Sequence, residues 1–451
     1  MKNIVLIGLP GCGKTTLGEA LAQKQKMRYI DLDHWIETQE NMKIADLFSA
    51  YGESYFRMME TKAAAYAAAE TSLIVSAGGG IVLKEENMAM LGAGGIIVFI
   101  DRDPAAIIND IETGNRPLLK DGAEKVKELY DQRIGLYRKY ADYIIKNESI
   151  TSSLDELEEI VTIAQRSIEL AVIGDPIAHS LSPEIHLTVL ERICEHVSYE
   201  RIRIEKGKLG DEIGRLQQYY DGFNITMPHK ADIMEYLTET DTDAQIYHSV
   251  NTAVKRTDGF VGYNTDGSGF AAMIYENGGS FEGKHIVVLG AGGAAGTIAI
   301  KAAQEGAAIV SILTRTPAKA DHLRNKITKL YPDTTTNLAE MTAEQLDRYC
   351  ATADMLVNGT PLGMHGSDEF ESLDFLKSLP KNALVCDLIY HPMKTLLYLK
   401  AEALGLQVIG GIQMLIDQAL IADELYIGHE LNFASMQNKV IDALIRKGKL
   451  S

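Results

Sequence analysis

The chain has 451 residues, which exceeds what one hydrophobic core usually holds, so two or three domains are expected. A hydrophobic content of 46% with 24% charged residues is typical of a globular protein. The formal charge of −18 argues against nucleic acid and anionic membranes as partners, because both would repel the protein.

Short apolar strands alternate with helical segments along the chain, which predicts an α/β protein with mostly parallel sheets. Three of these strands lead directly into glycine, over residues 4–7, 170–173 and 286–289. A helical, acidic stretch over 154–165 separates the first of these units from the second. We therefore expect domains over 1–165, 169–270 and 271–410, and C-terminal helices over 411–451 that return to the second domain.

The first glycine-rich turn is a complete phosphate-binding loop, because residues 8–15 match G-x-x-x-x-G-K-[ST] at every defined position. Its backbone N–H groups and the following helix dipole attract an anion. Lys14 is expected to reach the β- and γ-phosphates, and the Thr15 hydroxyl to hold Mg²⁺. A glycine turn without a ligand is the alternative. The predicted ATP contacts are Gly8, Gly11, Cys12, Gly13, Lys14, Thr15 and Thr16.

Two acids, Asp31 and Asp33, follow the next predicted strand. Alternation along a strand places both on one side, where one would serve the metal and the other a substrate hydroxyl. The alternative is a solvated strand end in which Asp33 caps a helix. Arg57 and Glu60 are three residues apart and are therefore neighbours on a helix. This spacing suits an arginine that is held in place to bind a substrate carboxylate. The alternative is a surface ion pair.

Further along this domain, glycine and arginine mark a second binding region. Three consecutive glycines over 78–80 follow an apolar strand and indicate close approach of a ligand to the main chain. Arg116 lies in a polar loop that suits a lid over the transferring phosphate, and Arg133 lies in a basic helical segment.

With these motifs, residues 1–165 resemble shikimate kinase. The resemblance implies that ATP and shikimate are the substrates, with Asp33 orienting and partly deprotonating the reacting hydroxyl. It places shikimate against Asp33, Arg57, Gly79, Gly80 and Arg133, Mg²⁺ against Thr15 and Asp31, and the γ-phosphoryl group against Lys14 and Arg116.

A second nucleotide site is predicted at Gly290, Gly292, Gly293 and Gly296, because a strand precedes this glycine-rich turn and a helix follows it. The next strand ends at Thr314, Arg315 and Thr316, with Lys319 shortly beyond. An acidic residue there would select a ribose 2′-hydroxyl, whereas an arginine suits a 2′-phosphate. The pattern favours NADP(H) over NAD, with a solvated arginine as the alternative.

Four clusters of short hydrogen-bonding side chains lie ahead of this turn, over 174–183, 223–230, 249–252 and 262–267. Such clusters suit recognition of a polyhydroxylated ring in a pocket built on loops.

With these motifs, residues 169–451 resemble shikimate dehydrogenase. The resemblance implies a substrate-binding domain, a Rossmann NADP-binding domain, and a catalytic pair of Lys230 and Asp266. A surface lysine is the alternative for Lys230. The implied substrate contacts are Ser180, Ser182, Thr226, Lys230, Asn251, Asp266, Tyr390 and Gln418. The sequence departs from the family pattern at Thr314, where asparagine is common, and at residues 247–249, where smaller side chains are usual.

Together the two halves predict a bifunctional enzyme that reduces 3-dehydroshikimate to shikimate and then phosphorylates shikimate, using NADP(H), ATP and Mg²⁺. We expect a cytoplasmic protein with small-molecule partners only, because no signal peptide and no membrane-spanning run is recognisable. The oligomeric state, monomer or homodimer, is left open. Two alternatives remain: one half kept as a non-catalytic ligand-sensing module, and a quinate/shikimate dehydrogenase that uses NAD.

Overall fold

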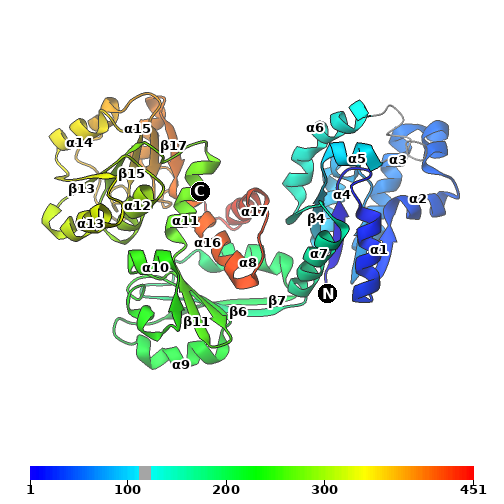
Figure 1. Ribbon diagram of the computed structural model, residues 1–451, viewed down its shortest axis with the longest axis horizontal. Coiled ribbons are helices and arrows are strands. Elements are labelled where there is room, and N and C mark those ends of the chain that lie inside the picture. Colours follow the sequence, from blue (N-terminus) through cyan, green and yellow to red (C-terminus); the bar gives the residue numbers. More distant parts are fainter. Residues whose placement is uncertain (111–122, 451) are drawn as a thin grey trace. The chain divides into compact units, whose positions relative to one another are not determined.

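The computed structural model describes residues 1–110 and 123–450, which group into two compact units (Figure 1). The first unit comprises residues 1–168, 187–198 and 427–439, and the second comprises 169–186, 199–426 and 440–451. The domain limits expected from the sequence stay a prediction, because two stretches of the second half belong to the first unit. Within the described ranges, no helix has the length and apolar character needed to cross a membrane.

The first unit is built on a parallel sheet of five strands in the order β2-β3-β1-β4-β5. The central strand β1 is buried throughout, as expected for a parallel sheet with helices on both faces. The strands are β1 Asn3–Ile7, β2 Arg28–Asp31, β3 Leu73–Ser76, β4 Gly95–Asp101 and β5 Tyr143–Lys146. The predicted strand over 4–7 is confirmed.

Helices follow the strands of this sheet in the expected alternation (Figure 1). They are α1 Lys14–Gln25, α2 Leu32–Glu40, α3 Ile44–Ala68, α4 Glu85–Gly94, α5 Pro104–Asp110, α6 Ala123–Tyr140 and α7 Ile150–Ala164, with a 3₁₀ turn η1 Ile81–Leu83. The predicted helix over 154–165 is α7.

The acids after β2 do not alternate along a strand as predicted. Strand β2 ends at Asp31, whose carboxylate caps helix α2 by accepting hydrogen bonds from the backbone N–H groups of Asp33 and His34 at 3.0 and 3.3 Å. Asp33 therefore lies in the first turn of α2, and the N-cap is Asp31 instead of Asp33. The strand prediction was wrong because a carboxylate that satisfies free N–H groups starts the helix at once.

A buried acid ties the additional segments of the first unit to its sheet. Asp142, directly before β5, has no exposed surface and accepts a hydrogen bond from Ile97 N at 2.8 Å. It pairs with Arg192 and, at 3.0 Å, with Lys439. These two cations lower the pKa of Asp142, although burial opposes them.

The second unit contains a mixed sheet of six strands in the order β7-β6-β8-β10-β11-β9. Strand β10 runs antiparallel to both β8 and β11, and Arg256 pairs with Gly259 at the end of a tight hairpin. This sheet is less parallel than predicted, because a two-residue turn joins only antiparallel strands. The strands are β6 Ser167–Gly174, β7 His196–Arg203, β8 Gly222–Ile225, β9 Glu239–Thr240, β10 Thr252–Arg256 and β11 Gly259–Tyr263.

The second unit also contains a parallel sheet of six strands in the order β14-β13-β12-β15-β16-β17. The strand order reverses between β12 and β15, which is where a doubly wound sheet binds its ligand. The strands are β12 His285–Leu289, β13 Ile309–Thr314, β14 Thr335–Glu340, β15 Met355–Asn358, β16 Leu384–Asp387 and β17 Gln407–Gly410.

The remaining helices follow in the second half of the chain, and α8 and α17 each contribute residues to both units (Figure 1). They are α8 Ser182–Ile193, α9 Leu209–Tyr219, α10 Thr242–Tyr247, α11 Asp266–Glu276, α12 Gly293–Gln304, α13 Pro317–Leu330, α14 Ala343–Cys350, α15 Leu396–Ala403, α16 Gly411–Ile427 and α17 Phe433–Arg446, with 3₁₀ turns η3 Asp232–Tyr236 and η4 Asp374–Ser378. The predicted α/β class with a Rossmann-type sheet is confirmed.

Candidate active sites

The phosphate-binding loop between β1 and α1 has the predicted shape. Its glycines Gly8, Gly11 and Gly13 have φ values of 144°, 88° and 103°, which only glycine adopts readily. Lys14 is 8% exposed and donates hydrogen bonds to the carbonyls of Gly8 and Leu9 at 2.9 and 2.8 Å. The loop therefore curls around its own ammonium group, and the N-terminus of α1 adds a favourable dipole for an anion.

Two oxygen donors lie side by side next to this loop. The Thr15 hydroxyl donates a hydrogen bond to Asp31 Oδ2 at 3.1 Å. Tyr29 Oη lies 3.4 Å from the same carboxylate oxygen, and burial raises the pKa of Tyr29 to about 12, so this phenol stays neutral. A hydroxyl and a carboxylate in contact fit a hard cation that also takes oxygen from water and phosphate, as Mg²⁺ does.

The glycines over 78–80 are crowded by side chains of the chain itself, whereas the sequence indicated close approach of a ligand. A Cβ on Gly78 would lie 2.5 Å from Asp33 Oδ1, and one on Gly80 would lie 2.2 Å from Arg57 Nη1. Gly79 is similarly close to Pro10. The glycines are therefore required by the chain's own side chains, and the approach of a ligand is not needed to explain them.

Arg57 and Glu60 form a partly buried pair and not a surface one. Arg57 Nη1 donates to Glu60 Oε2 at 2.5 Å, and Glu60 is only 2% exposed. Burial raises the pKa of Glu60, while the neighbouring Arg57 charge opposes that shift. Glu53 holds the other side of the guanidinium at 3.0 Å. The arginine is thus fixed in place, as binding a carboxylate requires.

Asp33 has the environment of a proton acceptor. Burial raises its pKa to about 7, and the negative charges of Asp31 and Glu60 add to the shift. Its Oδ1 atom is buried without a hydrogen-bond partner among residues 1–110 and 123–450. A carboxylate with a free oxygen and a pKa near neutrality is suited to accept a hydroxyl proton at physiological pH.

Helix α6 closes this site from another side. Arg133 Nη1 and the Tyr137 hydroxyl both donate to the carbonyl of Gly79, at 3.0 and 2.6 Å. Arg133 is therefore held next to the glycine run, as predicted from the sequence. The predicted lid residue, Arg116, lies outside the described residues.

Asn147, directly after β5, supports the phosphate-binding loop and was missed by the sequence analysis. Its Nδ2 donates to the carbonyl of Cys12 at 2.7 Å, and its Oδ1 accepts from Ser153 Oγ at 3.1 Å. Arg102 likewise donates to the carbonyl of Gly11, at 3.3 Å. These bonds hold the Gly11 and Cys12 carbonyls and so fix the backbone of the loop.

Replacing Asn147 with alanine is expected to raise the KM for ATP about three- to ten-fold, the usual effect of one lost hydrogen bond. The KM for the second kinase substrate should stay unchanged, because the Asn147 side chain bonds to the loop and to Ser153 and to none of the residues expected to bind that substrate. Steady-state kinetics with each substrate varied in turn checks this split. Asn438→Ala, on the exposed face of α17, is the matched control. Equal rises in both KM values would show a general distortion instead of a loop effect.

In the second unit, Lys230 and Asp266 form the predicted pair. Lys230 Nζ donates to Asp266 Oδ2 at 2.6 Å, and Asn251 Nδ2 donates to Asp266 Oδ1 at 2.9 Å. The Lys230 side chain is partly buried, which excludes a solvated surface lysine. Asp266 therefore holds the ammonium on one oxygen and is itself oriented through the other.

A buried polar network extends from this pair. Asn251 Nδ2 also lies 2.9 Å from Thr265 Oγ1 and 3.2 Å from Gln418 Oε1. Its Oδ1 accepts from the backbone N–H of Thr265 at 2.9 Å. Gln418 comes from α16, far along the chain from the loops that carry Asn251 and Asp266. The fold thus brings four predicted residues, Lys230, Asn251, Asp266 and Gln418, into one site.

The other predicted substrate residues are less closely connected. Ser180 and Ser182 contact each other, with the hydroxyl oxygens 3.2 Å apart, at the start of α8. Thr226 follows β8, and its backbone N–H bonds to the Ile173 carbonyl at 2.9 Å. Tyr390 is 38% exposed. Among the described residues, none of these side chains has a hydrogen bond to the Lys230–Asp266 pair.

Two tyrosines that the sequence analysis missed hold the Asn224 side chain. The hydroxyls of Tyr199 and Tyr426 donate to Asn224 Oδ1 at 2.5 and 3.1 Å. Asn224 Nδ2 in turn donates to the carbonyl of Asn251 at 3.3 Å. The two phenols thus fix the strand end beside the site, and burial raises both pKa values so that they remain neutral donors.

The turn after β12 fits a dinucleotide pyrophosphate. Gly290 has a φ of 98°, and a Cβ there would lie 3.2 Å from the carbonyl of Gly359. Open space surrounds the corresponding positions of Gly292 and Gly293, where α12 begins. Gly296 faces Leu323 of α13, the close helix contact that the third glycine of such turns permits.

The residues expected to select the cofactor lie at the end of β13. Thr314 is the last residue of this strand, and Thr316 precedes α13. Arg315 and Lys319 are exposed. In the described part of the chain, neither cation has an ion-pair partner, so both are available to an anionic group.

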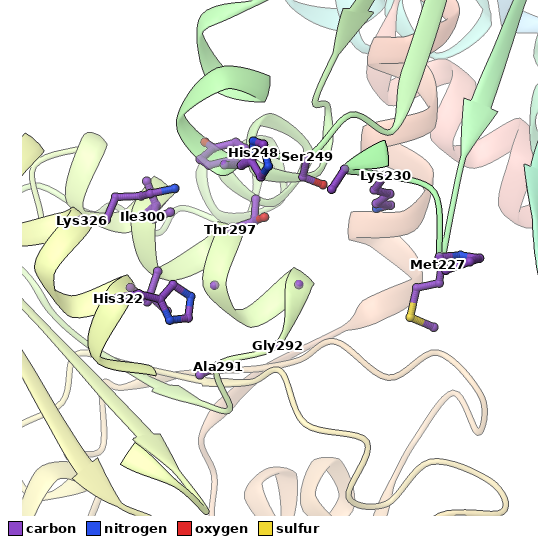
Figure 2. A pocket seen from close by; sticks show the side chains of 16 residues that line it. Met227, Lys230, His248, Ser249, Ala291, Gly292, Thr297, Ile300, His322 and Lys326 are labelled. Atoms are coloured by element: carbon purple, nitrogen blue, oxygen red, sulfur yellow. The ribbon is translucent and has the colours of Figure 1, made fainter. Parts of the chain in front are cut away.

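A pocket of about 430 Å³ joins Lys230 to the glycine-rich turn (Figure 2). Met227 and Lys230 lie at one end of it, and Gly292 and Gly293 are among the residues that line it. The pocket therefore gives a ligand at the pyrophosphate turn direct access to the Lys230 ammonium group.

Comparisons with known proteins agree with both sites. Residues 10–168 match the family model described as shikimate kinase, and residues 172–253 match the shikimate dehydrogenase substrate binding domain. The chain is similar to a shikimate dehydrogenase (NADP(+)) of Alkaliphilus oremlandii, with 37% identity over 256 residues, 56% of this chain and 90% of that protein. A shikimate dehydrogenase (NADP(+)) of Bacillus licheniformis is 36% identical over 276 residues, 60% of this chain and 96% of that protein.

The crystal structure of shikimate 5-dehydrogenase from Thermus thermophilus in complex with NADP(H) and shikimate is also similar. The two sequences are 29% identical, and the match covers 61% of this chain and 100% of the Thermus chain, with a TM-score of 0.53. The two family models lie one after the other along the sequence, with the kinase first. The chain therefore belongs to the shikimate dehydrogenase family and carries, ahead of that part, a shikimate kinase domain.

Proposed function

We propose that this chain catalyses two consecutive reactions, the NADPH-dependent reduction of 3-dehydroshikimate to shikimate and the ATP-dependent phosphorylation of shikimate to shikimate 3-phosphate. The observation that carries the proposal is the joint presence of two assembled charged sites. One is Lys230 paired with Asp266 at 2.6 Å, and the other is Asp33 beside the paired Arg57. Charged groups held together at such a cost in desolvation are typical of working sites.

In the dehydrogenase reaction, bound NADPH supplies the hydride to the ring ketone. Lys230 donates a proton to the oxygen that becomes an alkoxide, and Asp266 keeps the ammonium aimed at that oxygen. Asn251 orients Asp266 and is itself held by Gln418, and both amides offer hydrogen bonds to the ring hydroxyls. Ser180 and Ser182 supply hydroxyl donors for the substrate carboxylate.

In the kinase reaction, Arg57 and Arg133 bind the shikimate carboxylate, which a planar guanidinium recognises through two parallel hydrogen bonds. Asp33 orients the reacting hydroxyl and accepts its proton as the bond to phosphorus forms. Lys14, with Arg116 from the segment outside the described residues, stabilises charge on the transferred group. Thr15 and Asp31 would hold Mg²⁺ against the phosphates.

We propose NADP(H) as the nicotinamide cofactor, because Arg315 and Lys319 at the end of β13 suit a 2′-phosphate. Replacing Arg315 with alanine is expected to raise the KM for NADPH about 10- to 100-fold, as for a lost charge-assisted hydrogen bond, with kcat nearly unchanged. Arg324→Ala, on the following helix α13 and paired with Asp321, is the control. An R315A protein that kept its KM for NADPH would favour the NAD-dependent alternative.

The whole proposal is tested on the purified full-length protein with 3-dehydroshikimate, NADPH, ATP and Mg²⁺, following nicotinamide absorbance and ADP release together. NADPH oxidation with ADP formation that depends on it is the expected result. NADPH oxidation without ADP would reduce the first domain to a nucleotide-binding module or a kinase for another substrate. ADP formation only when shikimate itself is added, without NADPH oxidation, would count against either the dehydrogenase assignment or its cofactor.

A further inference from the structure

The pocket beside the glycine-rich turn continues past that turn into the groove between α12 and α13 (Figure 2). His248 and Ser249, which follow α10, lie on one side of this extension, and Thr297 of α12 lies opposite. His322 and Lys326 of α13 close its far end. None of the residues that line the pocket is acidic, although the chain carries 62 acidic residues and a charge of −18.

Two hydroxyl groups in this extension lack partners. Thr297 is 5% exposed, and its hydroxyl has no hydrogen bond within the described part of the chain. Ser249 uses its backbone N–H and carbonyl, with Ala244 at 3.1 Å and Asn264 at 2.7 Å, but its hydroxyl is likewise free among the described residues. Thr297 and Ser249 both line the pocket, so their hydroxyls are free to donate a hydrogen bond to a ligand bound there.

Of the basic groups, Lys326 is held beside the groove by a hydrogen bond, whereas the side chains of His248 and His322 are exposed. Lys326 Nζ donates to the carbonyl of Ile246 at 2.9 Å, which anchors the ammonium beside the groove with two N–H groups left. His248 occupies the left-handed region with a φ of 54°, an uncommon conformation that turns this residue at the end of α10. Lys230 lies at the other end of the same pocket.

This groove is separate from the path expected for the nicotinamide cofactor. A dinucleotide bound at Gly292 and Gly293 reaches Arg315 along the carboxyl ends of the strands. Neither Arg315 nor Lys319 lines the pocket, which runs instead beside α12 to Thr297 and Ile300. The groove also includes residues 247–249, where the sequence departs from the usual family pattern.

We propose that the groove between α12 and α13 is an anion site for inorganic phosphate or a small phosphate monoester, in addition to the cofactor site. Its polar side chains are donors or can act as donors, so they match a ligand that is mainly an acceptor of hydrogen bonds. Lysine, two imidazoles and two hydroxyls from three elements suit a tetrahedral dianion. Ile300 and Leu323 form an apolar wall against which the carbon body of an ester packs.

The test follows the histidine ring signals of the full-length protein by NMR while inorganic phosphate is added with NADP⁺ saturating. His248→Gln and His322→Gln assign the two signals, which isolates this groove from the phosphate-binding loop of the kinase domain. We expect both signals to shift and saturate together with one dissociation constant. Thr297→Val should weaken that constant about five-fold, as for one lost hydrogen bond.

Lys329→Met, on the exposed end of α13, is the control and should leave the constant unchanged. A repeat with glycerol 3-phosphate distinguishes an ester site, which binds it at least as tightly, from a site for free phosphate only. Shifts that grow linearly and appear equally with chloride would overturn the proposal. So would shifts that disappear when NADP⁺ is bound, because the ion would then occupy the pyrophosphate position.

Discussion

Replacing Lys230 with alanine is expected to lower the dehydrogenase kcat by a factor of about 10² to 10⁴, the usual contribution of a positioned proton donor. The KM for 3-dehydroshikimate should change little, because Asn251, Gln418 and the serines remain to bind the ring. The reason is the geometry of the site, where Asp266 holds the Lys230 ammonium at 2.6 Å and is itself held by Asn251. Steady-state kinetics of NADPH oxidation separates the two constants.

The same polypeptide supplies the control for this experiment. Kinase turnover should be unaffected, since Lys230 lies in the second unit, and an unchanged KM for NADPH shows that the second unit is folded. Lys255→Ala, an exposed lysine on β10, should leave both activities intact. Lys230→Arg keeps the charge but does not release a proton, so it should remain slow. A large rise in KM with kcat unchanged would reassign Lys230 to substrate binding.

Replacing Asp33 with asparagine is expected to lower kinase kcat by a similar factor, about 10² to 10⁴, because the amide does not accept the hydroxyl proton. In the unaltered protein, the pKa of Asp33 is raised to about 7 by burial and by neighbouring acids. Only the ionised carboxylate acts as a base, so kcat/KM should rise with pH and level off above about pH 7. A flat profile between about pH 5 and 9, or an active D33N protein, would contradict this role.

Asp33 should also make the stability of the first unit depend on pH. Its pKa rises from 3.8 to about 7 on folding, so the folded state binds the proton more tightly. The stability contributed by Asp33 is complete below about pH 4 and is lost as pH rises through about 7. D33N should abolish this dependence. Trp35 is the single tryptophan, lies two residues after Asp33 and stacks on Tyr66. Its fluorescence therefore reports the unfolding of this unit.

Local sequence patterns predicted most of the groups that carry charge in the two sites. Lys14, Thr15 and the glycines around them form one short motif whose spacing implies its geometry. Lys230 and Asp266 were singled out through the resemblance to shikimate dehydrogenase, whose motifs contain them. Asp31 and Asp33 show the limit of such patterns, because strand alternation and helix capping compete there and the cap prevailed.

Supporting residues were missed where their partners are distant in the chain. Asn147 reaches the carbonyl of Cys12, which is 135 residues away, and Tyr426 reaches Asn224 across 202 residues. A lone asparagine or tyrosine has no spacing signal, so nothing local distinguishes it from a surface residue. The glycines over 78–80 were recognised as unusual, but their cause, the crowding by Asp33 and Arg57, needs coordinates.

The sequence by itself determined the two nucleotide-binding turns and most of the strands around them, because strand burial, glycine turns and helix starts depend on neighbouring residues; the candidate catalytic residues came from its resemblance to two families. Only the tertiary structure decided which groups meet and how their chemistry changes. Asp33 acquires a pKa near 7 from burial beside Asp31 and Glu60, and Gln418 joins Asn251 through the packing of α16. Desolvation and contact between distant segments arise only when the chain is folded, and they set the charge states on which both reactions depend.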